Sequence, residues 1–130
     1  MKEHFIHARH AVAGEGKHPE VCGLNERLRF LRYGPGQYFN KHQDNFYTRG
    51  TEFGQEHQGE TSYLTFLLYL NEDAKGGETR FDYGDRYLDV VPKVGSALIF
   101  DHDLLHAGIP VISGTKYACR SDIMYTHVSG

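Results

Sequence analysis

The segment 32–45 holds a histidine and a carboxylate two residues apart, His42 and Asp44. It opens with the turn signal Gly-Pro-Gly at 34–36 and continues with alternating character, which predicts an extended strand. Successive side chains of a strand point to opposite faces, so His42 and Asp44 share one face. Such a pair is two-thirds of the 2-His-1-carboxylate triad that holds non-haem Fe(II) with open coordination positions. The pair is a weak signal without a third ligand.

Two interpretations of the segment 102–106, His-Asp-Leu-Leu-His, compete for that third ligand. On a helix, two histidines four residues apart with an acid between them resemble a zinc-hydrolase site. However, Gly108 and Pro110 leave little room for such a helix. We therefore favour His106 as the ligand that completes the triad. His102 is then a buried histidine, or one that orients a ligand.

Lys116 lies ten residues after His106, at the start of the last predicted strand. A lysine is ordinarily a surface residue. A charge count gives it a second interpretation, because Fe(II) and an ionised Asp44 leave one positive charge. A dicarboxylate such as 2-oxoglutarate adds two negative charges, and Lys116 would neutralise the site by pairing with the carboxylate far from the metal.

The elements that position these residues are predicted to be short strands. Strand-like patterns occupy residues 27–33, 63–70, 78–81, 87–91, 96–100 and 115–126. The residues at 63–70 are apolar on both faces, which is typical of a buried central strand. Turn signals every 8 to 12 residues indicate a β-sandwich or barrel. Arg27, Arg29 and Arg32 are interpreted as the solvent side of the first of these strands.

Between the metal pair and the central strand, the polar, glycine-containing residues 45–62 predict a mobile loop. Because a long loop in a compact domain is often functional, a lid over the metal is one hypothesis. The N-terminal segment 1–27 is predicted to be separate from the domain 28–130. His4, His7 and His10 have helical spacing, so a short helix is one interpretation of that segment.

Composition excludes several classes of function. The 130-residue chain carries a formal net charge of −3, which gives no electrostatic reason to expect nucleic acid as a partner. The longest apolar run has eight residues, which predicts no membrane span. Two cysteines are too few for a disulfide framework, and no signal-peptide pattern is present, so a cytoplasmic location is the default expectation.

Taken in order along residues 28–125, the motifs resemble the Fe(II)/2-oxoglutarate-dependent dioxygenases, and more narrowly their prolyl 4-hydroxylase-like branch. The motifs are Arg32-Tyr33-x-x-Gly36-Gln37, His42-x-Asp44, Thr65-x-x-x-Tyr69-Leu70-Asn71, Gly76-Gly77-Glu78-Thr79, Pro92-x-x-Gly95-x-Ala97, His106-x-Gly108 and Lys116. The resemblance implies an all-β core folded as a double-stranded β-helix, or jelly roll. It also implies an enzyme that hydroxylates a C–H bond and releases succinate and CO2.

The resemblance also assigns roles to residues. Iron would be held by His42, Asp44 and His106. Lys116 would bind the distal carboxylate of 2-oxoglutarate, aided by Tyr33 and Thr65, with Tyr69 as a further candidate and Arg120 ranked behind Lys116. The cofactors implied are Fe(II), 2-oxoglutarate, O2 and ascorbate as reductant.

The substrate implied is a peptidyl proline. Two alternatives stay open: the same chemistry on a small molecule, and a metal-binding jelly roll without turnover. The short N-terminal segment departs from the family, because helices that cover the sheet there are mostly missing.

Overall fold

The computed structural model describes residues 3–5 and 17–129. The strands, in chain order, are β1 (Glu3–Phe5), β2 (Lys17–Leu24), β3 (Arg29–Tyr33), β4 (Phe39–His42), β5 (Thr61–Tyr69), β6 (Lys75–Gly76), β7 (Thr79–Asp82), β8 (Tyr87–Val90), β9 (Ala97–Asp101), β10 (His106–Gly108), β11 (Val111–Ser113) and β12 (Lys116–Ser129). A single 3-10 turn, η1 (Thr51–Phe53), interrupts the strands in the described part of the chain. The all-β prediction is confirmed.

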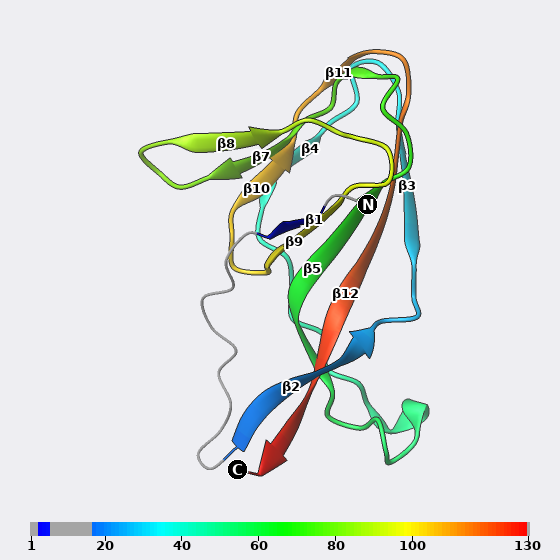
Figure 1. Ribbon diagram of the computed structural model, residues 1–130, viewed down its shortest axis with the longest axis vertical. Helices are drawn as coiled ribbons and strands as arrows, with labels where there is room; N and C mark the ends of the chain where they lie inside the picture. Colours follow the sequence, from blue (N-terminus) through cyan, green and yellow to red (C-terminus); the bar gives the residue numbers. More distant parts are fainter. Residues whose placement is uncertain (1–2, 6–16, 130) are drawn as a thin grey trace.

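The larger sheet is built around β12, which runs through almost the full length of the molecule (Figure 1). Its order is β1-β9-β5-β12-β2, and β3 also pairs with β12. β5 therefore lies between β9 and β12, as its apolar pattern predicts. Because β12 has 14 residues, one end pairs with β3 and the other with β2.

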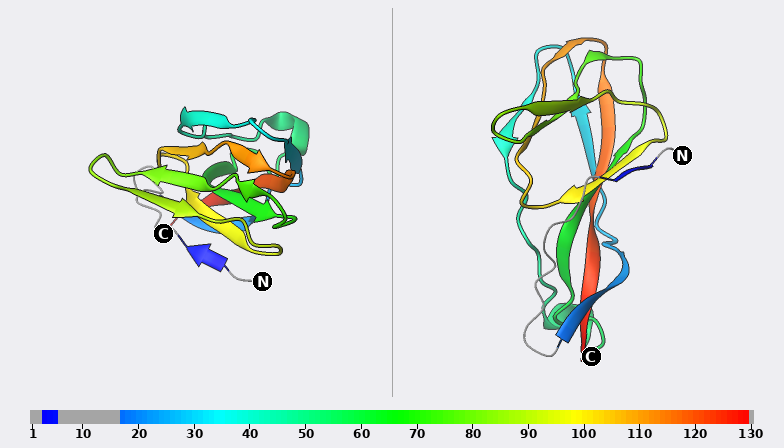
Figure 2. Two further views of the ribbon diagram at one scale, coloured as in Figure 1. Left: turned by 90° about the horizontal axis from the view of Figure 1, so that it is seen from above. Right: turned by 60° about the vertical axis from the view of Figure 1, so that its left-hand side comes forward.

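The smaller sheet faces one half of the larger one, and its order is β4-β10-β7-β8. Side chains from both sheets meet in the core, which contains Tyr69, Phe81, Leu98, Phe100 and Ala118. Two facing sheets, antiparallel except for the pairing of β1 with β9, form the predicted jelly roll. The right-hand view of Figure 2 shows β2, β5 and β12 extending well beyond the smaller sheet.

The helix considered for residues 1–27 is not found where that segment is described. Residues 3–5 form β1, which pairs with β9, and residues 17–24 form β2, which pairs with β12. His4 thus lies in a strand, whereas His7 and His10 lie outside the described residues. These residues form strands because β9 and β12 provide backbone partners for them, and sheet pairing overrides the local helical spacing of the histidines.

The loop between β4 and β5 is anchored away from the metal pair. The buried guanidinium of Arg49 donates one hydrogen bond to Glu60 and two to Glu26, at 2.8–3.0 Å. Figure 1 shows η1 at the end of the molecule where β2 and the C-terminus lie, far from β4 and β10. Residues 51–59 therefore do not cover His42 and Asp44, and the lid hypothesis is wrong for them.

Among the described residues, no helix has the length and apolar character needed to cross a bilayer.

Candidate metal centre and active site

Two histidines and one aspartate converge at the open edge between the two sheets. His42 on β4 and His106 on β10 are cross-strand partners, and Asp44 follows β4. His42 Nε2 lies 3.2 Å from Asp44 Oδ1, and His106 Nε2 lies 3.6 Å from Asp44 Oδ2. One donor atom from each of the three residues lies within 4.8 Å of the others. The structure thus brings together the three residues predicted as metal ligands.

Both imidazoles are held in the form that binds a metal. His42 Nδ1 lies 2.6 Å from the carbonyl oxygen of Asn40, and His106 Nδ1 lies 2.8 Å from that of Leu104. A carbonyl only accepts, so each Nδ1 carries the proton and each Nε2 is free to ligate. Burial lowers the pKa of His106, which further favours the neutral ring. The donor set therefore fits an Fe(II) ion.

Asp44 is oriented by a chain of buried hydrogen bonds. The Thr65 hydroxyl donates to Asp44 Oδ2 at 2.6 Å and lies 2.8 Å from His102 Nδ1. Ser62 Oγ lies 2.9 Å from His102 Nε2 and accepts the Tyr47 N–H at 2.9 Å. Thr65, His102 and Ser62 are buried, so their bonds are shielded from water.

The proton positions in this chain follow from Thr65. Its single proton goes to Asp44, so its oxygen accepts from His102 Nδ1, and His102 Nε2 accepts from Ser62. Burial lowers the pKa of His102 and keeps this ring neutral. Residues 102–106 form a turn leading into β10, not a helix, which removes the zinc-hydrolase interpretation. His102 instead donates to Thr65, whose hydroxyl in turn donates to the aspartate ligand.

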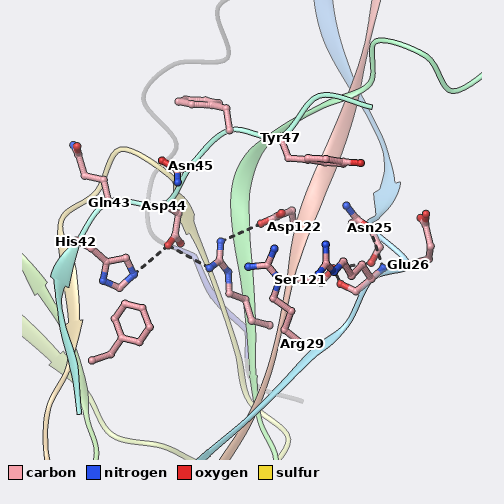
Figure 3. A pocket seen from close by; sticks show the side chains of 14 residues that line it. Asn25, Glu26, Arg29, His42, Gln43, Asp44, Asn45, Tyr47, Ser121 and Asp122 are labelled. Carbon is pink, nitrogen blue, oxygen red and sulfur yellow. Dashed lines mark hydrogen bonds and ion pairs between the residues drawn. The ribbon is translucent and has the colours of Figure 1, made fainter. Parts of the chain in front are cut away.

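Two cavities meet at the metal centre. The inner one, about 190 Å³, lies between the sheets and is lined by Tyr33, Thr65, Thr79, His106 and Lys116, among others. The outer one, about 580 Å³, is a groove lined by residues 25–27 and 43–47 and by part of β12. His42 and Asp44 line both, as Figure 3 shows for the groove side. A metal held there would be reached from two directions.

Lys116 lies at the closed end of the inner cavity. Only 6% of the residue is exposed, and its Nζ lies 5.2 Å from the ring centre of Tyr33 and 5.9 Å from that of Tyr69. No carboxylate of the described residues forms an ion pair with it. Burial lowers the pKa of Lys116 to about 8. The carboxylate of Glu78 opposes this shift electrostatically but forms no ion pair with Lys116, so the buried ammonium group can bind an anionic ligand.

The other residues predicted to bind the co-substrate divide between the two ends of the cavity. Tyr33 is the cross-strand partner of Lys116, and burial raises the pKa of its phenol. Tyr69 is fully buried, with its hydroxyl 2.5 Å from Thr79 Oγ1, and its ring lies beside Lys116 without lining the cavity. Thr65 does not lie with them, because its hydroxyl is committed to Asp44 and His102.

Arg29 also lines the site, a role that the sequence did not predict for it. Arg29 is exposed, as the sequence predicts, but it shares the inner face of β3 with Leu31 and Tyr33 and lines both cavities. The sequence does contain a signal for this position, because Arg29 lies four residues before Tyr33 and residues two or four apart share a strand face. Arg120, ranked behind Lys116, lies beside the aspartate ligand, with Nη1 3.5 Å from Asp44 Oδ1. Arg32 lies on the opposite, outer face of β3 and lines neither cavity.

Comparisons with known proteins agree with this site. Residues 28–121 match the sequence model of the 2OG-Fe(II) oxygenase superfamily. Prolyl 4-hydroxylase 2 of Arabidopsis thaliana is 30% identical over 146 aligned residues, which cover 80% of this chain and 48% of the plant protein. A viral collagen prolyl hydroxylase from Paramecium Bursaria Chlorella virus-1 superposes with a TM-score of 0.52 at 26% identity, over 76% of this chain and 61% of the viral one.

A Pseudomonas putida prolyl-4-hydroxylase shares the fold, with a TM-score of 0.58 and 22% identity over 78% of this chain and 54% of the bacterial one. The chain spans less than half the length of the first curated relatives it matches. The matched region nevertheless contains every residue of the metal cluster and Lys116. The chain therefore belongs to the 2OG-Fe(II) oxygenase superfamily.

Proposed function

We propose that this chain is an Fe(II)- and 2-oxoglutarate-dependent dioxygenase that hydroxylates a peptidyl proline and releases succinate and CO2. One observation carries the proposal. The ligand set of His42, Asp44 and His106 opens into the cavity that ends at the buried Lys116. The relatives named as prolyl 4-hydroxylases support proline in a peptide as the substrate.

The charges of the site balance when its partners are present. A divalent metal contributes two positive charges and Lys116 one, while Asp44 contributes one negative charge and 2-oxoglutarate two. When bound, Fe(II) with 2-oxoglutarate supplies the activation of O2 that converts the C–H bond to C–OH. One 2-oxoglutarate, one O2 and one C–H bond give one succinate, one CO2 and one alcohol. Ascorbate is the expected reductant in the assay.

The residues of the chain bind and orient the reactants. Lys116 would donate to the distal carboxylate of 2-oxoglutarate, and the Tyr33 hydroxyl is a second donor on the facing strand. Apolar side chains from both sheets, including Leu31, Leu67 and Phe100, line the space between Lys116 and the metal ligands and limit water there. Thr65 would hold the Asp44 carboxylate toward the metal.

The experiment is an assay of succinate formed from 2-oxoglutarate with Fe(II) and ascorbate, with and without a panel of proline-containing peptides. We expect at least one peptide to stimulate succinate release and to gain one oxygen atom by mass spectrometry. The His42→Ala variant is the inactive control.

The other outcomes separate the alternatives. Succinate release that no peptide stimulates, but that a small molecule does, would indicate the small-molecule oxygenase. Binding of 2-oxoglutarate without succinate release under any condition would indicate a jelly roll without turnover. A parent protein without affinity for 2-oxoglutarate would overturn the proposal.

A further inference from the structure

Two arginines lie directly opposite each other on the inner face of the larger sheet, on the groove side of the metal ligands. Arg29 on β3 is the cross-strand partner of Arg120 on β12. Both side chains line the inner cavity and the outer groove. Like charges directly opposite in an antiparallel pair destabilise the sheet. A repulsive pair at this position would be offset by an anion bound between the two guanidinium groups.

The acidic residues of the groove offset this charge only in part. Arg120 lies 3.5 Å from Asp44 Oδ1 and 3.5 Å from Asp122 Oδ1, beyond the usual length of an N–H···O hydrogen bond. Asp122 Oδ1 itself is buried without a hydrogen-bond partner. Glu26 is occupied by two hydrogen bonds from Arg49.

Arg29 has no ion pair or hydrogen bond from its side chain to any residue in 3–5 or 17–129. It extends from β3 into the groove that Asp44 and Asp122 also line (Figure 3). Arg27, which is exposed, adds a third guanidinium to the lining of this groove. Once the metal and Lys116 balance Asp44 and 2-oxoglutarate, and Arg49 balances Glu26, the guanidinium groups of Arg27, Arg29 and Arg120 outnumber the one remaining carboxylate of the groove, that of Asp122. The groove therefore favours an anionic ligand.

This anion is distinct from the distal carboxylate of the co-substrate. Lys116 and Arg120 are four residues apart on one face of β12, so their Cα atoms are separated by about 13 Å at the usual rise of a strand. Lys116 lies at the closed end of the inner cavity, whereas Arg29 and Arg120 also line the open groove. The cation at Lys116 thus lies deep in the inner cavity, whereas the pair Arg29 and Arg120 lies where that cavity meets the outer groove.

We propose that Arg29 and Arg120 form a subsite for a carboxylate of the substrate, so that the enzyme selects proline peptides with an acidic residue next to the target. Two guanidinium groups can bind one carboxylate with several charge-assisted hydrogen bonds. The inference rests on the proposed function, because it concerns the substrate of the same metal centre.

The test uses three labelled peptides of equal length, identical except for Glu, Gln or Lys on both sides of a central proline. Their binding is measured by fluorescence anisotropy at low salt, with the protein loaded with Mn(II), which replaces Fe(II) without turnover, and 2-oxoglutarate. We expect the Glu peptide to bind about ten- to a hundredfold more tightly than the Gln peptide. The Lys peptide should bind most weakly, and the difference should shrink with added salt.

Arg29→Gln should remove most of the discrimination between the Glu and Gln peptides and leave the affinity for 2-oxoglutarate unchanged. It removes a repulsive pair, so we expect no loss of thermal stability. Arg32→Gln is the matched control, since it removes the same charge from the same strand but on the exposed outer face. This variant should discriminate as the parent does.

Equal affinity of the parent for the Glu and Gln peptides, or discrimination that survives Arg29→Gln, would overturn the inference. It would also fail if a free carboxylate such as N-acetylglutamate bound as tightly as the Glu peptide, because the substrate would then be a small molecule. In the first two cases 2-oxoglutarate still binds and the proposed function stands, whereas in the third the iron chemistry stands and the peptide substrate is replaced by a small molecule. A parent that fails to bind 2-oxoglutarate would remove both.

Discussion

Lys116 and Arg120 lie on the same face of β12, and both line the inner cavity beside the metal ligands. They differ in burial and in the charge of their neighbours. Lys116 is enclosed, with the rings of Tyr33 and Tyr69 beside it, and forms no ion pair with an acidic side chain of the described residues, although Glu78 acts on it electrostatically. Arg120 is more exposed, lies opposite Arg29 on the neighbouring strand, and is 3.5 Å from a carboxylate oxygen of Asp44 and of Asp122. We call these the closed end and the open end of the site.

The difference indicates two kinds of ligand. A closed end with one buried cation and rigid aromatic walls suits a ligand of constant length and charge. An open end with several adjustable charged groups suits ligands that vary, because an exposed guanidinium can re-pair without a large desolvation cost. A co-substrate shared by every turnover fits the first, and a substrate segment fits the second. The predictions below test this division, beginning with the metal centre that separates the two ends.

The largest effect is expected for the ligands themselves. Replacing His42, Asp44 or His106 with Ala removes one of three protein donors, so binding of Fe(II) or Mn(II), measured by anaerobic titration, should be lost. His57→Ala is the control, because that residue pairs with Glu60 in the distal loop. Retention of metal by His42→Ala together with its loss on His102→Ala would contradict the assignment.

At the closed end, Lys116→Ala should leave metal binding intact and weaken 2-oxoglutarate binding about ten- to a hundredfold, which corresponds to one charge-assisted hydrogen bond of roughly 1.5–3 kcal/mol. Lys116→Arg keeps the charge but changes its shape, so it should recover part of the loss. Lys93→Ala, an exposed lysine, is the matched control. Unchanged affinity in Lys116→Ala would move the carboxylate partner to the open end, with Arg120 first.

Breaking the hydrogen bond from Thr65 to Asp44 should have an intermediate effect on metal affinity. Thr65→Val removes the hydroxyl that donates to Asp44 while keeping the shape of the side chain, so metal affinity should fall about tenfold, at the lower end of such changes. Thr65→Ser keeps the donor and should restore most of the affinity. If Val and Ser variants bound metal equally, the hydrogen bond would not orient the ligand.

The pKa of Lys116 predicts how the closed end responds to pH. Burial lowers this pKa from 10.5 to about 8, so above pH 8 the free protein must take up a proton to bind 2-oxoglutarate. Affinity measured by titration should then fall about tenfold per pH unit, and Lys116→Arg should abolish this slope. The stability of the ligand-free protein should change in the opposite direction. Between pH 8 and 10.5 the unfolded chain holds a proton that the folded chain has lost, so this lysine makes the free energy of unfolding rise with pH.

Much of the closed end was predictable from the sequence, and the open end was not. Side chains alternate between the two faces of a strand with a period of two residues. This alternation predicts that His42 and Asp44 share one face, and that Lys116, Ala118 and Arg120 share one face of the last strand. The strand order and the sheet that each strand joins depend on long-range pairing, which period alone does not contain. The opposition of Arg29 and Arg120 is of this kind, since it requires the register between β3 and β12.

The two wrong expectations have the same origin. Histidines at helical spacing near the N-terminus and a polar loop near the metal pair are both local patterns. The pairing of β1 with β9 and of β2 with β12, and the bonds from Arg49 to Glu26 and Glu60, are not local. Contacts between residues at least 11 positions apart therefore decided the structure of both segments.

The smallest predicted effect tests how rigid the closed end is. Gly77 has a φ of +73°, and a Cβ there would lie 3.1 Å from Lys116 Cδ. Gly84 has a φ of +90°, and a Cβ there would meet nothing within 4 Å. Both Gly77→Ala and Gly84→Ala should lower the free energy of unfolding by about 1 kcal/mol, because L-residues avoid this backbone conformation. Only Gly77→Ala should also displace the lysine, with a several-fold loss of 2-oxoglutarate affinity. Equal affinities in the two variants would mean that Lys116 can shift without cost, and the closed end would then be as adaptable as the open one.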